Sequence, residues 1–123
     1  MSEKNELKVI KPFGPTIARV KMSNELIKVL NDYVDKTISD KNKIKDLDHG
    51  NNLAGNVTQE FKLEKKFIEE SGYKNFLSKS VHEWLKISGY KEIKDFEIIS
   101  SWIVRQFKNE YNPVHWHGGH VSG

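Results

Sequence analysis

Residues 96–123 read FEIISSWIVRQFKNEYNPVHWHGGHVSG, and this stretch decides the predicted fold. Its first part, residues 96–107, carries apolar or aromatic side chains at both even and odd positions. Because successive side chains of a strand point to opposite faces of a sheet, this pattern predicts a strand that is covered on both faces. The second part, residues 112–123, loses the apolar pattern and concentrates histidine and glycine.

Upstream of this stretch the apolar spacing predicts two packing helices. Residues 24–37 follow a capping Ser23 and carry apolar side chains at helical spacing. A second helical region begins at Phe67, is interrupted at Gly72 and ends at Gly89. Residues 38–52, rich in Asp, Lys and Asn, are predicted to form a mobile loop.

Two extended segments are predicted in addition. Residues 16–22 alternate as a half-buried strand does, directly after a turn rich in proline and glycine. Residues 53–63 suit an extended segment at a sheet edge, with Gly55 at a bend or bulge. No linker or internal repeat divides the chain, so we expect a single α+β domain over residues 1–123, with helices in front of a sheet that begins near the end of the sequence.

The composition narrows the classes of function. The chain has 37% hydrophobic and 30% charged residues and a net charge of +3 that is dispersed, which does not indicate nucleic-acid binding. It contains no cysteine, so thiolate metal sites, disulfides and cysteine nucleophiles are excluded. No apolar run reaches the length of a membrane span, and residues 1–11 lack a secretory signal. We therefore expect a cytoplasmic protein without a membrane or nucleic-acid partner.

The strongest chemical signal is a histidine cluster. Three of the five histidines, His115, His117 and His120, fall within six residues. On a strand, residues two apart share a face, so the imidazoles of His115 and His117 can converge on one metal ion such as iron, zinc, copper or nickel. A solvated turn is the alternative interpretation. His120 follows a flexible Gly-Gly and is assigned to a loop or to the surroundings of the ligands, whereas His49 and His82 are assigned ordinary surface or boundary roles.

The sequence around this cluster resembles a known family. The last part of the chain resembles a family of 2-oxoglutarate- and iron(II)-dependent oxygenases of phages and marine bacteria. The resemblance begins with Ser101-Trp102-Ile103-Val104 and a turn. It continues with the lead Asn112-Pro113-Val114-His115-Trp116-His117, then glycines and Val121-Ser122-Gly123. The segments Phe13-Gly14-Pro15 and Leu53-Ala54-Gly55-Asn56-Val57 also look like the N-terminal region of that family. The match spans most of the chain, although only the last twenty or so residues are specific.

The resemblance implies a double-stranded β-helix, or jelly-roll barrel, with N-terminal helices packed on its beginning. It implies a hydroxylase (dioxygenase) in which iron(II) is the cofactor and 2-oxoglutarate and O2 are cosubstrates. The substrate it implies is a small molecule or a peptidyl side chain. Because only the front part of the barrel is matched, the expected chain is an N-terminal portion or a shortened reading frame, incomplete and inactive alone. The oligomeric state stays open.

Carried over to this sequence, His115 is the expected first iron ligand, and His117 occupies the place where the family of such enzymes usually has a carboxylate. A neutral imidazole leaves one more positive charge on the metal than an aspartate does. Either the site uses three histidines or a carboxylate from elsewhere completes it. No histidine follows at the distance that the distal ligand needs, and no Arg or Lys follows to bind the distal carboxylate of 2-oxoglutarate. Tyr111 is a candidate for the surroundings of the cosubstrate, with sheet packing as its alternative role; Trp102 and Arg105 are weaker candidates.

Two alternatives in other classes stay open. The first is a non-catalytic metal-binding protein with a cupin-like barrel, which binds metal through His115 and His117 and ignores 2-oxoglutarate. The second is a structural or interaction protein, for example a phage component, in which the histidine cluster is only a loop.

Overall fold

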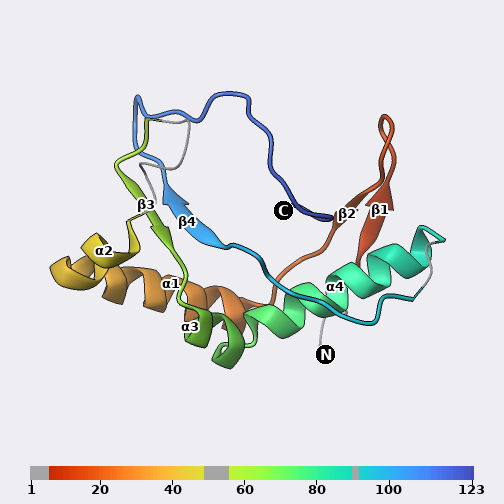
Figure 1. Cartoon of the computed structure of the whole chain (residues 1–123), viewed down its shortest axis with the longest axis horizontal. Helices are drawn as coiled ribbons and strands as arrows, with labels where there is room; N and C mark the ends of the chain where they lie inside the picture. Colours follow the sequence, from red (N-terminus) through yellow and green to blue (C-terminus); the bar gives the residue numbers. More distant parts are fainter. Residues whose placement is uncertain (1–5, 49–55, 90–91) are drawn as a thin grey trace. The chain divides into compact units, whose positions relative to one another are not determined.

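The computed structural model describes residues 6–48, 56–89 and 92–123, and these contain four helices and two small antiparallel sheets (Figure 1). The expected α+β class is therefore confirmed. The chain divides into two compact units, one of residues 1–32 and 66–97 and the other of residues 33–65 and 98–123. In the described ranges the strands form two separate two-stranded sheets and not a closed barrel.

The first unit contains a hairpin and a long helix. Strands β1 (Lys8–Ile10) and β2 (Ile17–Arg19) pair antiparallel, with Val9 opposite Ala18. The strand predicted for residues 16–22 is thus confirmed over its first part. Helix α4 (Tyr73–Ile87) is tied to this hairpin because the indole Nε1–H of Trp84 donates to Thr16 Oγ1 at 2.8 Å.

The predicted interruption of the second helical region is confirmed. Helix α3 (Lys65–Glu70) ends before Gly72, and α4 begins directly after it. Gly72 has a φ of +87°, in the left-handed region that glycine adopts without the steric penalty of a Cβ atom. The single glycine therefore turns one apolar-patterned stretch into two helices.

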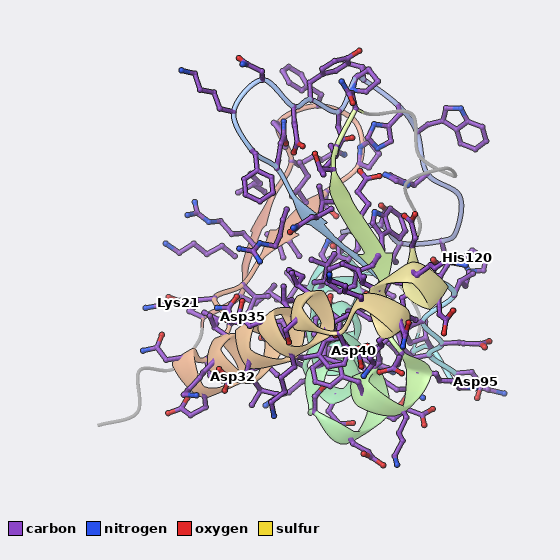
Figure 2. The ribbon with its side chains drawn as sticks, turned by 90° about the vertical axis from the view of Figure 1, so that its left-hand side faces the viewer. Lys21, Asp32, Asp35, Asp40, Asp95 and His120 are labelled. Atoms are coloured by element: carbon purple, nitrogen blue, oxygen red, sulfur yellow. The ribbon has the colours of Figure 1, made fainter. Side chains whose placement is uncertain are left out.

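Helix α1 (Asn24–Ser39) forms where the apolar spacing predicts it, and the boundary between the two units falls within it, after Asp32. Ser23 acts as the predicted cap, since its Oγ accepts a hydrogen bond from the amide of Leu26 at 3.2 Å. The acidic side chains of Asp32 and Asp35 lie along this helix (Figure 2).

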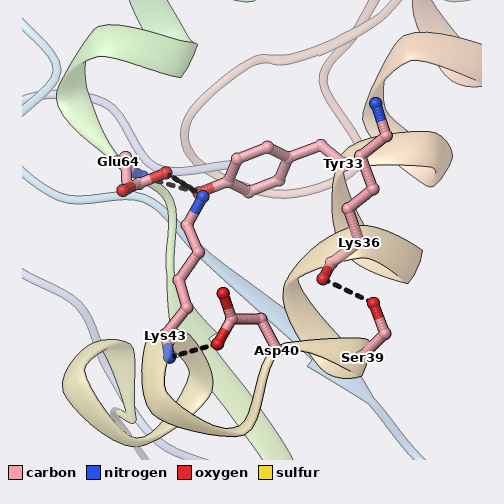
Figure 3. Close-up of polar contacts among 6 residues, drawn as sticks. All are labelled: Tyr33, Lys36, Ser39, Asp40, Lys43 and Glu64. Atoms are coloured by element: carbon pink, nitrogen blue, oxygen red, sulfur yellow. Dashed lines mark hydrogen bonds and ion pairs between the residues drawn. The ribbon is translucent and has the colours of Figure 1, made fainter.

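The prediction of a mobile loop over residues 38–52 is wrong for its first part, because residues 41–47 form helix α2 (Lys41–Leu47). Asp40 starts this helix with its Oδ1 atom, which accepts from the amides of Asn42 and Lys43 at 3.1 Å each. Figure 3 shows the bond from Lys43. This side chain satisfies two of the amides that a helix leaves unpaired at its N-terminus. Residues 49–52 of the predicted loop lie outside the described residues.

The second unit is built around one sheet. Strands β3 (Gln59–Lys62) and β4 (Trp102–Arg105) pair antiparallel, with Phe61 opposite Ile103. Phe61 has no exposed surface and forms the centre of this unit's core. The extended segment predicted for residues 53–63 is confirmed where β3 forms, and residues 53–55 lie outside the described residues.

The prediction that residues 96–107 form a strand covered on both faces is wrong in length and in burial. Only residues 102–105 are in β4, and Ile99 and Phe107 are 80% and 51% exposed. The apolar pattern on both parities therefore does not correspond to two covered faces of the described sheet. Several of the apolar side chains of this stretch therefore lie at the surface of the second unit.

A polar cluster joins the end of α1 to the segment after β3 (Figure 3). Tyr33 donates its hydroxyl hydrogen to Glu64 Oε2 at 2.9 Å, and Lys43 Nζ lies 2.9 Å from the same oxygen. Burial, with the negative charge of Glu64 beside it, raises the pKa of Tyr33, and the hydrogen bond to Glu64 raises the pKa of Lys43. The cluster fixes the end of α1, together with α2, to the chain beyond β3.

No helix in the described ranges is both long and apolar enough to cross a membrane.

Candidate metal centre

The predicted ligands lie on the segment that follows β4. After a turn at residues 107–110, Tyr111 pairs with Asn56 through both backbone hydrogen bonds, at 2.8 and 3.2 Å. The chain then continues through Pro113 to His115 and His117 without regular secondary structure, and both histidines are exposed. The two histidines therefore come together on an irregular segment and not on the ladder-forming strand that we assumed.

The rings of His115 and His117 nevertheless lie close together, edge to face. Their Nε2 atoms are 2.9 Å apart, and the ring planes meet at 81°. Two ligands that each lie about 2.1 Å from a metal ion and subtend a right angle there are about 3.0 Å apart, whereas a tetrahedral angle would separate them by about 3.4 Å. The observed separation matches two adjacent positions of an octahedral metal ion.

The tautomer of His115 is fixed by the backbone. Its Nδ1 atom lies 2.6 Å from the carbonyl oxygen of Pro113, and a carbonyl can only accept, so Nδ1 carries the hydrogen and donates it. The Nε2 atom of His115 then keeps its lone pair and can bind a metal ion. A hydrogen bond donated by the ring nitrogen that does not bind the metal is the usual support of metal-binding histidines.

The ring of His117 is held from the sheet. Its centroid lies 5.4 Å from the centroid of Trp102 at an interplanar angle of 45°, a distance at which aromatic rings attract each other. Trp102 is the first residue of β4, so it links His117 to an ordered strand. Trp102 thus contacts a predicted ligand directly, which gives it a clearer role than the weak candidacy it had from the sequence.

The other candidates are placed as follows. Tyr111 contributes the backbone pairing with Asn56, and its side chain is 57% exposed, so a role near a cosubstrate stays a prediction. Arg105 lies 3.9 Å from Asp35 on α1 and is directed there.

His120 lies on the exposed C-terminal segment (Figure 2). His82 bonds through Nδ1 to the backbone oxygen of Ser78 at 2.6 Å, in keeping with an ordinary structural role, and His49 lies outside the described residues.

The third ligand is not supplied by the part of the chain that the structure describes. Within residues 6–48, 56–89 and 92–123, no group of three His, Asp or Glu side chains is arranged to hold a metal ion. The separation of the two imidazoles is compatible with two adjacent positions of a metal ion. Two neutral ligands also leave the full charge of a divalent ion uncompensated, which favours an anionic ligand at the remaining positions.

Sequence reasoning missed Glu110, which lies in the turn just before the histidine segment. Its carboxylate accepts hydrogen bonds from the amide and hydroxyl of Thr58 and from the amide of Phe107. These bonds lower the pKa of Glu110, the Thr58 hydroxyl contributing most and the Phe107 amide next. No sequence pattern could have identified this contact, because Thr58 and Glu110 are 52 residues apart.

Comparison with known proteins gives no family assignment: no family model, no curated protein and no solved structure matches this chain.

Proposed function

We propose that this chain belongs to an iron(II)- and 2-oxoglutarate-dependent oxygenase, in which His115 and His117 supply two adjacent ligands of the iron. The observation that supports this most is the 2.9 Å separation of their Nε2 atoms, with His115 held in the tautomer that leaves Nε2 free. The resemblance of residues 101–123 to the oxygenase family motif supports the choice of iron and cosubstrate. The same resemblance is the reason to propose a double-stranded β-helix, of which the β3–β4 pair would be the beginning.

The residues of this chain would bind and orient the metal ion. When bound, iron(II) with 2-oxoglutarate supplies the chemistry of O2-dependent hydroxylation. Pro113 and Trp102 fix the two imidazoles before the ion arrives, which reduces the ordering that binding must accomplish. A small-molecule or peptidyl substrate is the proposed target.

The absence of a carboxylate at position 117 bears on the cosubstrate. A divalent ion held by two neutral imidazoles keeps its full charge, and 2-oxoglutarate carries two negative charges. Chelation brings these opposite charges into direct contact, so the cosubstrate itself can provide the neutralisation that an aspartate provides elsewhere. We therefore expect metal and 2-oxoglutarate to bind with positive coupling.

The test is an anaerobic titration of the protein encoded by the complete reading frame that contains this sequence. Iron(II) and 2-oxoglutarate are added together, and the visible charge-transfer absorption of the chelate is followed. The proposal predicts a band that requires both additions and is lost in His115→Ala and in His117→Ala. A protein that binds iron(II) but develops no band contradicts the oxygenase assignment.

The second candidate function is a non-catalytic metal-binding protein. It is favoured by one observation, that the described residues bring together two ligands and no third. In the same titration such a protein binds the metal ion through His115 and His117 with an affinity that 2-oxoglutarate leaves unchanged. A phage structural or interaction protein, the other alternative, would bind neither.

A further inference from the structure

We propose that Glu110 is a positioning residue for His115 and His117, because its carboxylate holds a bulge from which the histidine segment starts. This inference rests on the proposed metal site, and it adds a residue that the family resemblance does not name. Glu110 itself is five residues from His115 and is assigned no contact with the metal ion.

The carboxylate of Glu110 joins two segments distant in the sequence. Its Oε1 atom accepts from the amide of Thr58 at 2.9 Å and from the hydroxyl of Thr58, while Oε2 accepts from the amide of Phe107 at 2.8 Å. The side-chain amide of Gln106 also donates to the backbone oxygen of Glu110 at 2.6 Å. Hydrogen bonds to an ionised acceptor are shorter and stronger than those between neutral groups. Both oxygens of the carboxylate are therefore engaged in holding the turn against the segment before β3.

The turn that Glu110 closes is an insertion in the sheet. Gln59 pairs with Arg105, so an unbroken register would place Asn56, three residues before Gln59, opposite Lys108, three residues after Arg105. Asn56 instead pairs with Tyr111. Three extra residues are thus accommodated on one side of the pair, as in an enlarged β-bulge, a feature that redirects the chain beside functional sites.

The geometry of the insertion is tight. The amide of Glu110 donates to the carbonyl of Phe107 at 3.1 Å, which closes a four-residue turn. Asn109, the third residue of that turn, has a φ of +71°, as a type II turn requires at this position. Asparagine tolerates this conformation better than most residues do. The turn and the carboxylate together set the direction in which the chain leaves the sheet at Tyr111.

The bulge influences the position of the metal ligands because only a few residues separate them from it. Tyr111 is locked to Asn56, and only Asn112, Pro113 and Val114 intervene before His115. Pro113 narrows the backbone freedom of that connection and supplies the carbonyl that holds His115 Nδ1. Without the Glu110 carboxylate, the start of this short connection is less constrained, and the two Nε2 atoms are brought together less often.

The test is a calorimetric titration of the chain with Ni2+, which binds imidazole ligands well and is stable in air. The variants are Glu110→Ala, Glu110→Gln and, as a matched control, Glu97→Ala, which removes a carboxylate of the other compact unit. Loss of a group that hydrogen-bonds directly to a metal ligand costs roughly 10- to 100-fold in affinity. Glu110 acts on the ligands only through the backbone, so we expect Glu110→Ala to weaken Ni2+ binding several-fold, up to about 10-fold, and Glu97→Ala to leave it unchanged.

Glu110→Gln provides the conservative comparison. Its amide oxygen can still accept from Thr58, but its NH2 group cannot accept from the amide of Phe107. We expect an affinity between those of the parent chain and Glu110→Ala, with the same two-histidine coordination in the nickel absorption spectrum. A purely structural role would lower the melting temperature of the metal-free variants without this graded change in affinity.

Three outcomes would overturn the inference. If Glu110→Ala folds and binds Ni2+ within twofold of the parent chain while His115→Ala and His117→Ala abolish binding, the role of Glu110 is rejected and the metal site is kept. If Glu110→Ala does not fold, Thr58→Val removes only the hydroxyl donor, and unchanged Ni2+ affinity in that variant rejects the role. If the parent chain binds no Ni2+, both the inference and the proposed metal site fail.

Discussion

The Nε2 atoms of His115 and His117 are 2.9 Å apart, so a proton or a cation has to lie between them. Two nitrogen lone pairs at this distance repel, and His115 has already committed its ring hydrogen to the carbonyl of Pro113. A hydrogen on His117 Nε2 satisfies the pair in the absence of metal. When a metal ion takes the place of that hydrogen, the hydrogen moves to Nδ1 of His117, so that both ligands stay neutral imidazoles.

A pH dependence follows at Glu110. The hydrogen bonds from the Thr58 hydroxyl and the Phe107 amide lower its pKa below the ordinary value of 4.5. Because the folded pKa is lowered, the stabilisation is complete above the unfolded pKa and is lost as the pH falls through the folded pKa. We expect the amide proton resonances of Thr58 and Phe107 to titrate together in nuclear magnetic resonance spectra, with a midpoint below 4.5.

The control for this titration is Glu110→Gln, in which neither amide resonance should shift over the same range. A midpoint at or above 4.5 in the parent chain would mean that the two amides do not hold the carboxylate in solution. Metal binding near neutral pH is unaffected by this titration, because Glu110 stays ionised there.

At the scale of elements, α2 depends on its first residue. Helix α2 has only seven residues and none of them is buried, so its own packing contributes little. Asp40 accepts from two amides at its start. Replacing such a cap by alanine typically costs about 1 kcal/mol. We expect Asp40→Ala to lower the free energy of unfolding by about this amount in urea titrations, and Asp40→Asn, which keeps the acceptor oxygen, to lower it less.

An unchanged midpoint in Asp40→Ala would show that the Lys43 to Glu64 ion pair, and not the cap, maintains α2. These two residues lie 2.9 Å apart but are about 40% exposed, so water screens the pair strongly.

The same helix shows what the sequence could predict about elements and what it could not. α1, α3 and α4 follow from apolar spacing, because each combines a helical stripe with a cap or a glycine stop. α2 has no apolar stripe, so periodicity predicted a loop, although Asp40 is an ordinary capping residue. The strand at residues 96–107 was predicted too long because apolar residues at both parities were interpreted as buried. Ile99 shows that such residues can be exposed.

The histidine pair could be predicted because its two members are neighbours in the sequence and carry a recognisable spacing. The residues that hold the two histidine rings in place could be predicted only in part. Pro113 belongs to the same motif, but Trp102 contacts His117 across fifteen residues, and Glu110 bonds to Thr58 across 52 residues. Contacts between distant residues depend on the pairing of β3 with β4, which no local pattern specifies.

At the scale of the whole molecule, burial is limited. Among the described residues, five hydrophobic side chains are buried: Leu7, Val34, Phe61, Leu63 and Ile68. Large apolar side chains are exposed in the second unit, namely Ile99, Val104, Phe107, Tyr111, Val114, Trp116 and Val121. With so few buried side chains, each one contributes a large share of the free energy of unfolding, which for folded proteins is only about 5–15 kcal/mol.

Phe61 is the most informative side chain at this scale. It is fully buried in the second unit, and truncating a buried phenylalanine typically costs about 3–5 kcal/mol. We expect Phe61→Ala to unfold at much lower urea concentration than the parent chain, or to be unfolded in its absence. Phe61→Leu, which retains most of the volume, should recover the larger part of the loss. Equal stability of Phe61→Ala and the parent chain would show that β3 and β4 do not form the core of this unit.

The central claim, that His115 and His117 bind one metal ion together, is tested most directly by X-ray absorption spectroscopy of the chain loaded with iron(II) under argon. The account predicts scattering from two imidazole rings per iron at about 2.1 Å, reduced to one ring in His115→Ala and in His117→Ala. Identical spectra from the parent chain and from the variant lacking both histidines would contradict it.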